Sequence, residues 1–325
     1  MQEAKKFRRI GVLTSGGDAP GMNAAVRAVT RTALARGVEV MGIYNGYNGL
    51  INGDMKLLDA RDVSDILQRG GTMLYTARCL DFKTEEGLAR AIEACRESKI
   101  DGIVACGGDG TFRGALDLTR RGIPCVAIPC TIDNDISSTD YSIGYDTAVN
   151  TVIQMVDRLT DTCQSHLRCS VVEVMGRAAG HIAADTGTAT GACAIAVGEL
   201  PVDMDKIVAR VNACKEAGRH HFIVMVSEGA GITKELTAKI EKETGIETRA
   251  TVLGHVQRGG TPTVRDRVIA TRMGHKAVDL LLEGRSNLVV AMRKDEITAV
   301  DIEEALRMTK SVDRSLIEMN EEISF

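Results

Sequence analysis

Short apolar runs rich in valine and isoleucine recur along the chain, and each is followed by glycines and then by a longer stretch with helical spacing. This alternation is typical of strand–helix units built around a parallel sheet, so the sequence predicts an α/β fold. We expect strands at 10–14, 38–44, 102–106, 126–129, 170–174, 194–197, 222–226 and 251–254. We expect helices at 21–36, 84–98, 111–121, 146–160, 204–217, 234–243 and 265–282.

The chain length of 325 residues predicts about two domains. No linker, charge block or low-complexity tract divides the sequence, so two domains would be joined tightly or by more than one crossing of the chain. Residues 102–111 and 222–233 each combine an apolar strand, a turn with glycine and an acid, and a helix. This similarity is a weak indication of duplicated architecture.

Composition and charge exclude several classes of function. The net charge of −4 gives no global attraction to nucleic acid or anionic membranes, and 3% aromatic residues leave few platforms for base stacking. No stretch reaches the roughly 18 apolar residues of a membrane span. The nine cysteines are odd in number and include no CxxC pair, which favours a reducing cytosol over a disulfide framework or zinc ribbon. We expect a cytoplasmic protein without nucleic-acid or membrane partners.

Two glycine-rich turns each follow a predicted strand and precede a predicted helix. The first contains Gly16 and Gly17 in TSGGDAPGMN, and the second is Gly107 to Thr111 in GGDGT. Glycines let the backbone approach a ligand, and a helix N-terminus attracts phosphate. Asp109 has the oxygen ligands that Mg²⁺ prefers. The alternatives are an ordinary strand-to-helix turn and a turn aspartate bonded only to its own loop.

The segment Thr131-Ile132-Asp133-Asn134-Asp135 follows the predicted strand at 126–129. Two carboxylates beside a hydroxyl and an amide can supply a general base for an attacking alcohol and a group that orients it. Acidic loops are also common on protein surfaces. Its place at the same sheet edge as the glycine turns favours a catalytic role.

Cationic side chains near strand ends add local positive charge to an acidic chain. The planar guanidinium of arginine suits phosphate oxygens, although a single such residue is more often a solvated surface group. Glycine turns, magnesium, arginines and a carboxylate base are the recurring parts of phosphoryl-transfer sites, so this is the reaction class that we infer. The cationic set is Arg78, Arg168, Arg177, Arg249, His255 and Arg258.

Six ordered motifs, TSGGDAPGMN, GGDGT, TIDND, VVEVMGR, ETRATVLGHVQRGG and DRVIATRMG, make the chain resemble the bacterial-type ATP-dependent 6-phosphofructokinases along its whole length. The resemblance implies two three-layer α/β/α Rossmann-like domains with mostly parallel sheets and an active-site cleft between them. It implies an ATP-binding domain at 1–144 plus 257–307 and a fructose 6-phosphate-binding domain at 145–256 plus 308–325. The implied reaction is the glycolytic transfer of the ATP γ-phosphoryl group to the sugar 1-hydroxyl.

The resemblance also implies roles for individual residues. Asp133 would be the base, and Thr131, Asp135 and Arg177 would position and stabilise the transferred group. The implied ATP-binding residues are Gly17, Arg78, Cys79, Gly108, Asp109, Gly110 and Thr111, with Asp109 serving Mg²⁺. The implied sugar-binding residues are Thr131, Ile132, Asp133, Arg168, Met175, Gly176, Arg177, Glu228, Arg249, His255, Val256, Gln257 and Arg258.

Oligomerisation and regulation are implied in the same way. In this family the arginines that match Arg168 and Arg249 come from a neighbouring subunit, so we expect a homotetramer. Arg27, Arg31, Arg219 and His221 match the basic pattern of the family's effector site. Ala60, Thr160, Cys193, Ala217 and His220 replace charged residues there, so we expect weak or absent classical regulation.

Two alternative functions remain open. Pyrophosphate-using relatives typically have Asp after GGD and Lys before TIDND, where this chain has Gly110 and Cys130. Cys130 is also not the small glycine common in ATP users, so a pyrophosphate donor stays possible. A catalytically inactive regulatory paralogue is less favoured, because Asp109, Asp133, Asp135 and Arg177 are all present.

Overall fold

The computed structural model describes residues 7–324, and these residues form two compact units. Among the described residues, the first unit comprises 7–132, 136–146 and 258–309, and the second comprises 133–135, 147–257 and 310–324. The resemblance implies that residues 1–144 belong to one domain. In the structure, contacts between residues group Asp133–Asp135 with the second unit instead. Residues 1–6 and 325 of the two predicted domains lie outside the described part.

The first unit is a seven-stranded sheet with strand order β11-β10-β5-β4-β1-β2-β3. Neighbours from β10 to β2 pair in parallel, and the edge strands β3 and β11 are antiparallel. The strands are β1 (Arg9–Thr14), β2 (Glu39–Ile43), β3 (Met55–Leu58), β4 (Gly102–Gly107), β5 (Cys125–Pro129), β10 (Leu288–Arg293) and β11 (Glu296–Asp301). Central strands such as β4 are buried throughout, which explains their continuous apolar sequence.

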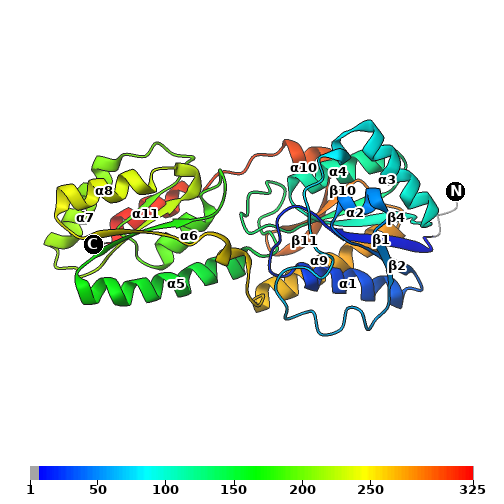
Figure 1. The fold of residues 1–325 in the computed structure, drawn as a ribbon, viewed down its shortest axis with the longest axis horizontal. Helices are drawn as coiled ribbons and strands as arrows, with labels where there is room; N and C mark the ends of the chain where they lie inside the picture. Colours follow the sequence, from blue (N-terminus) through cyan, green and yellow to red (C-terminus); the bar gives the residue numbers. More distant parts are fainter. Residues whose placement is uncertain (1–6, 325) are drawn as a thin grey trace. The chain divides into compact units, whose positions relative to one another are not determined.

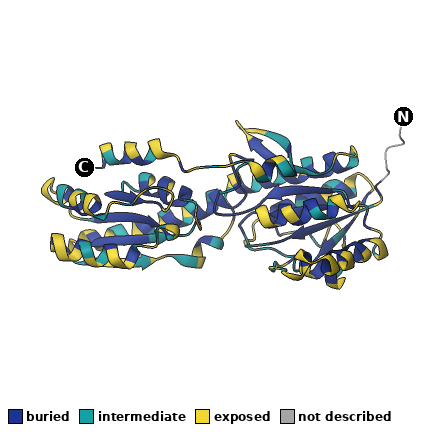
Figure 2. Ribbon diagram, turned by 90° about the horizontal axis from the view of Figure 1, so that it is seen from above, coloured by how far each residue is buried: buried dark blue, intermediate teal, exposed yellow. Residues whose placement is uncertain are grey.

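Helices cover both faces of this sheet (Figure 1). On one face α1 packs against α9, while α2, α3, α4 and α10 share an apolar core with the sheet on the other. Figure 2 shows buried strands between helices whose outer faces are exposed. The helices are α1 (Met22–Ala35), α2 (Tyr47–Asn52), α3 (Glu85–Glu97), α4 (Asp109–Arg120), α9 (Val264–Leu282) and α10 (Ile302–Arg307), with the short 3₁₀ helix η1 (Asp81–Lys83) before α3.

The second unit is a four-stranded parallel sheet with order β7-β8-β6-β9. Helices α7 and α8 bury an apolar core against one face, and α11 packs against α6 and β7. The strands are β6 (Cys169–Val174), β7 (Ala194–Ala196), β8 (Phe222–Ser227) and β9 (Thr248–Val252). The helices are α5 (Tyr145–His166), α6 (His181–Ala189), α7 (Met204–Glu216), α8 (Thr233–Thr244) and α11 (Arg314–Ile323), with 3₁₀ turns η2 (Glu228–Ala230) and η3 (Gly254–Arg258).

The predicted α/β class is confirmed. Some of the predicted helices and strands differ from those in the structure. The strand expected at 251–254 is β9 at Thr248–Val252, and Gly254 begins η3 instead. This edge strand has a mostly exposed, polar sequence, so its apolar signal is weak. The sequence pattern also missed β3, β10, β11, α2, α6, α10 and α11, most of which are short. Among the described residues no helix is long and apolar enough to cross a membrane.

Candidate active site

Three loops at the carboxyl ends of β1, β4 and β5 adjoin one another in the first unit. The Ser15 backbone N–H donates to the Cys106 carbonyl at 2.9 Å, and the Thr111 hydroxyl donates to the Ser15 carbonyl at 3.2 Å. The Cys130 N–H donates to the Gly107 carbonyl at 2.9 Å. These bonds bring the Gly17 loop, the GGDGT turn and the start of the TIDND loop to one sheet edge, where ligands of α/β sheets gather.

The glycines of the GGDGT turn serve two different purposes. A Cβ on Gly107 would collide with the Ser15 carbonyl and the Thr111 side chain, so close packing requires this glycine. Cβ positions on Gly108 and Gly110 would have no atom within 4 Å. Helix α4 begins after Gly108 without a side-chain cap, and a helix N-terminus attracts anions. The open space at Gly108 and Gly110 therefore adjoins a helix end that favours an anion.

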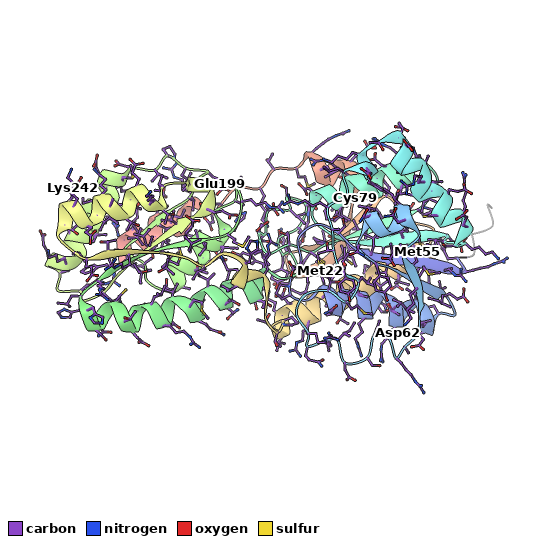
Figure 3. The ribbon with its side chains drawn as sticks, in the orientation of Figure 1. Met22, Met55, Asp62, Cys79, Glu199 and Lys242 are labelled. Carbon is purple, nitrogen blue, oxygen red and sulfur yellow. The ribbon has the colours of Figure 1, made fainter. Side chains whose placement is uncertain are left out.

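Further predicted ligand residues lie beside the Gly17 loop. A Cβ on Gly17 would come within 2.7 Å of Arg258 Nη1, and that nitrogen donates to the Asp18 carbonyl at 3.2 Å. The Thr76 hydroxyl donates to the Gly16 carbonyl at 2.7 Å, which ties the segment before Arg78 and Cys79 to the same loop. Arg78 is exposed and Cys79, labelled in Figure 3, is half-buried.

Asp109 fits the magnesium role that the sequence predicts. Its carboxylate is exposed at the first position of α4, between Gly108 and Gly110, whose surroundings are open. Within residues 7–324 no group of three or more His, Cys, Asp or Glu side chains is arranged to hold a metal. A single carboxylate suits Mg²⁺, because this ion commonly binds one or two carboxylates together with substrate phosphates and water.

In the second unit, Asp133 pairs with Arg177. The Arg177 Nε lies 3.3 Å from Asp133 Oδ2; the carboxylate is fully buried, whereas the Arg177 side chain is 56% exposed. Because Asp133 is buried, removing Arg177 would leave its carboxylate as an uncompensated buried charge. The structure therefore brings the predicted base and the predicted stabilising cation together.

Glu228 shapes the loop that carries Arg177. Its Oε1 accepts the backbone N–H of Gly176 at 3.1 Å and that of Arg177 at 2.5 Å. Arg177 has a φ of 54°, which is uncommon for a residue with a side chain and needs such support. Gln257 Oε1 accepts the Met175 N–H at 3.2 Å. Four of the predicted sugar-binding residues, Met175, Gly176, Arg177 and Glu228, thus form one hydrogen-bonded group with Gln257.

Arg168 and Arg249 form a second cationic group, joined by Glu247. Glu247 accepts from Arg168 Nε at 2.7 Å and from Arg249 Nη2 at 2.6 Å. The hydrogen bond from Arg168, and then that from Arg249, lower the pKa of the Glu247 carboxyl. Our sequence reasoning did not assign Glu247, which lies two residues before Arg249 and immediately before β9.

The remaining predicted residues are less closely grouped. His255 and Val256 are exposed on η3, while Thr131 and Ile132 are buried and Asp135 is half-buried. Among the predicted effector residues, Arg31 on α1 donates to the Ala60 carbonyl and to the Ser64 hydroxyl, both at 3.2 Å. Arg27 is half-buried one turn earlier on α1. In the second unit, Arg219 and His221 are half-buried, and burial followed by the charge of Arg219 lowers the pKa of His221.

Comparisons with a family model and with curated proteins both match this chain to phosphofructokinases. The family model described as phosphofructokinase matches residues 9–281. An ATP-dependent 6-phosphofructokinase of Bacillus pumilus is 53% identical over 318 residues, covering 98% of this chain and 100% of the relative. One from Clostridium botulinum is 52% identical over 313 residues, covering 96% and 98%.

Solved structures extend the similarity to the fold. Phosphofructokinase from Saccharomyces cerevisiae matches 98% of this chain with a TM-score of 0.88 and 34% identity. This chain spans only 48% of that yeast chain. A pyrophosphate-dependent phosphofructokinase from Marinobacter aquaeolei has a TM-score of 0.87 over 97% of this chain and 88% of its own. Its 23% identity shows a shared fold alone.

Proposed function

The chain belongs to the phosphofructokinase family, and we propose that it transfers the γ-phosphoryl group of ATP to the 1-hydroxyl of fructose 6-phosphate. The products are fructose 1,6-bisphosphate and ADP, so the enzyme is a glycolytic phosphotransferase. The observation that carries the proposal is the ion pair between buried Asp133 and Arg177. The loop that contains Asp133 begins at Cys130, which is hydrogen-bonded to Gly107 of the second glycine turn. This pair supplies a base and a cation for phosphoryl transfer.

In the first unit, the backbone binds the nucleotide. The N–H groups at the start of α4 receive phosphate oxygens, and Gly108 and Gly110 leave room for the phosphate chain. Gly17, Arg78, Cys79 and Thr111 complete the ATP-binding set. Asp109 would hold Mg²⁺, which supplies positive charge against the phosphate oxygens when bound.

In the second unit, side chains activate and hold the acceptor. Asp133 takes the proton of the sugar 1-hydroxyl as its oxygen attacks phosphorus, and the bond to the ADP oxygen breaks. Arg177 is paired with Asp133, and its positive charge stabilises the transferred phosphoryl group. Thr131 and Asp135 help to position that group. The Asp133–Arg177 pairing orients the carboxylate before the sugar binds.

The sugar phosphate is held by the two groups of polar residues described above. Glu228 and the Met175 to Arg177 loop bind the sugar hydroxyls, together with Ile132, His255, Val256 and Gln257. Arg168, Arg249 and Arg258 bind the 6-phosphate, since guanidinium groups pair with phosphate through two parallel bonds. Glu247 keeps Arg168 and Arg249 close despite their like charge.

We further propose that the enzyme is a cytoplasmic homotetramer in which Arg168 and Arg249 act in the site of a neighbouring subunit. In support, Arg249 is 70% exposed and lies on the edge strand β9, together with the exposed apolar Val252. An exposed edge strand is a ready surface for association. Sedimentation of the purified chain tests the tetramer, and a monomer with full activity would contradict it.

A comparison of phosphate donors tests the proposed reaction. Initial rates with ATP and with pyrophosphate are measured at saturating fructose 6-phosphate and Mg²⁺, with fructose 1,6-bisphosphate as the product assayed. We expect product only with ATP, because the half-identical relatives are named as ATP-dependent and the pyrophosphate-dependent structures are below 25% identity. Faster product formation with pyrophosphate would select that alternative, and nucleotide binding without product would indicate an inactive paralogue.

A further inference from the structure

Two cysteines and one arginine form a cluster in the second unit that the proposed reaction does not use. Cys193 precedes β7, Cys214 lies on α7, and Arg219 follows that helix. Arg219 Nη1 lies 3.7 Å from the Cys193 sulfur and 3.9 Å from the Cys214 sulfur. Both thiols are fully buried, and a hydrogen bond joins them. Both sulfur atoms thus lie beside the same guanidinium nitrogen.

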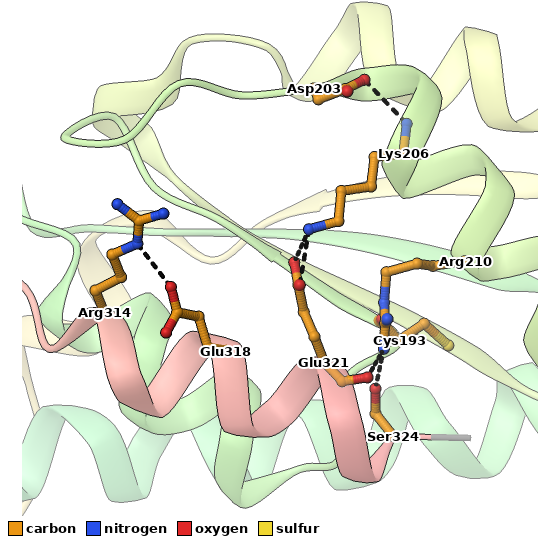
Figure 4. Close-up of polar contacts among 8 residues, drawn as sticks. All are labelled: Cys193, Asp203, Lys206, Arg210, Arg314, Glu318, Glu321 and Ser324. Carbon is orange, nitrogen blue, oxygen red and sulfur yellow. Dashed lines mark hydrogen bonds and ion pairs between the residues drawn. The ribbon is translucent and has the colours of Figure 1, made fainter.

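The segment after α11 covers this cluster. The same Arg219 Nη1 donates to the Ser324 carbonyl at 3.0 Å, and the Cys214 thiol donates to that oxygen at 3.3 Å. Arg210 donates to the Cys193 carbonyl at 2.9 Å and to the Ser324 hydroxyl at 2.8 Å (Figure 4). A single set of side chains therefore holds both the thiols and their cover.

The surroundings make the two sulfurs unequal. The hydrogen bond from Cys193, followed by the hydrogen bond and charge of Arg219 and the charge of Arg210, lowers the pKa of the Cys214 thiol. The same bond raises the pKa of Cys193, which stays protonated. Ionised Cys214 gives up its bond to Ser324 and accepts from Arg219 and Cys193. A thiolate beside a protonated thiol is the arrangement of an attacking and a resolving cysteine.

A second pair of cysteines serves as an internal reference. Cys106 and Cys130, at the ends of β4 and β5, are also buried and hydrogen-bonded to each other. Burial, followed by the bond to Cys106, raises the pKa of Cys130, and no cation offsets this change. Burial likewise raises the pKa of Cys95, which lies in the same apolar core as Cys125, to about 12. Proximity of two thiols alone does not create a reactive site, so the arginines set the Cys193 pair apart.

Access to Cys214 requires only a small displacement. Arg219 is half-buried, and Lys215, Glu216, Ala217 and Gly218 before it are exposed. The described part of the cover is Ser324 at the end of α11, and helix ends open locally at little cost. A small uncharged oxidant can therefore reach the sulfur when Ser324 moves away.

We propose that Cys193 and Cys214 form an oxidation site that reduces a hydroperoxide and closes to a disulfide. The Cys214 thiolate attacks the O–O bond, forming an S–OH group and releasing the alcohol or water after proton uptake. The Cys193 sulfur then displaces hydroxide from Cys214, which leaves as water with the Cys193 proton. Two thiols lose two electrons in total and the peroxide gains them. The disulfide carries no charge to pair with Arg219, the side chain that also holds the Ser324 carbonyl, so the cover is loosened.

The test oxidises the full-length protein with a small excess of hydrogen peroxide at neutral pH and maps its cysteines by peptide mass spectrometry without reduction. We expect loss of two thiols per chain and a Cys193–Cys214 linked peptide that dithiothreitol removes. Cys214 should react roughly tenfold faster than Cys95, because a larger fraction of it is thiolate. Hydrogen exchange of the α11 amides should increase in the oxidised protein.

Variants separate the steps. In Cys193→Ser, oxidation should stop at an S–OH on Cys214 that a sulfenic-acid reagent traps, whereas Cys95→Ser should form the disulfide like the unmodified chain. Arg219→Gln should slow the reaction of Cys214. The proposal fails if Cys214 stays reduced while other thiols oxidise, if Cys106–Cys130 links first, or if Cys95 reacts at an equal rate. These readouts on the unmodified chain do not depend on kinase activity, so they do not fail with the proposed function.

Discussion

The two units carry their proposed ligand sites in opposite ways. In the first unit, the site consists mainly of backbone: glycine turns, an uncapped helix start and open space at Gly108 and Gly110. In the second unit, it consists of side chains that hold one another, such as Asp133 with Arg177 and Glu247 with Arg168 and Arg249. A backbone site is damaged by adding atoms, whereas a side-chain site is damaged by removing them. The comparison therefore predicts which substitutions matter in each unit.

The largest expected effect is at Asp133. Asp133→Ser should lower kcat by about 10²–10⁴ with little change in the KM for fructose 6-phosphate, because the base is lost while sugar contacts remain. Steady-state kinetics measures both constants. Asp161→Ser, at an exposed position on α5, is the matched control and should behave like the unmodified enzyme. Unchanged turnover in Asp133→Ser would show that another group removes the proton.

Removal of Arg249 should act on binding instead. Its charge-assisted bonds to a phosphate contribute roughly 1.5–3 kcal/mol, so Arg249→Ala should raise the KM for fructose 6-phosphate about 10- to 100-fold. kcat should change little, since the 6-phosphate is remote from the reacting hydroxyl. Glu247→Gln keeps both arginines and should have a smaller effect than Arg249→Ala. An unchanged KM would remove Arg249 from the phosphate site.

Adding atoms at Gly110 is the corresponding test in the first unit. Gly110→Asp places a carboxylate in open space, so folding should be unaffected, while repulsion of phosphate should raise the KM for ATP roughly tenfold. Gly107→Ala should instead lower the melting temperature, because its Cβ collides with the Ser15 carbonyl. Thermal unfolding together with ATP kinetics distinguishes the two glycines. An equal fall in melting temperature in Gly107→Ala and Gly110→Asp would contradict the different roles given to the two glycines.

Effectors should change the reaction rate less than the substitutions above change kcat or KM. Arg219 is bonded to the Ser324 and Gly191 carbonyls. The family resemblance implies that Arg219 belongs to an effector site and that Cys193 replaces an acid there. We expect ADP or phosphoenolpyruvate to change the rate at subsaturating fructose 6-phosphate by less than about twofold, since several phosphate-binding charges are absent. Strong activation or inhibition of fructose 1,6-bisphosphate formation by either compound would contradict this expectation.

The last expected effect lies outside the proposed active site and concerns stability in acid. Burial, and then the charge of Lys310, lowers the pKa of His181 from 6.5 to about 4. The unfolded chain therefore binds this proton first, and the free energy of unfolding should fall as the pH drops from about 6.5 to about 4. Denaturant unfolding should show a smaller fall in His181→Asn. His166→Asn, at an exposed position, should retain the full dependence.

Sequence reasoning was most accurate where local pattern and burial agree. The buried strands β4, β5, β6 and β8 were predicted within about one residue, because their apolar runs are continuous. The edge strand β9 was misplaced, because exposed polar residues such as Arg249 give little hydrophobic signal. Short helices such as α2 and α10 were missed for a related reason, since six residues show too little periodicity.

The motifs by themselves determined the α/β class, the family and the residue types available for phosphoryl transfer, because these depend on local spacing and on glycine's lack of a side chain. Tertiary structure decided which of those residues meet. Glu228 shapes the Arg177 loop, Glu247 joins two arginines, and Arg219 binds two sulfurs and Ser324. Most of these contacts join segments distant in sequence, so their energy depends on packing that no local pattern encodes.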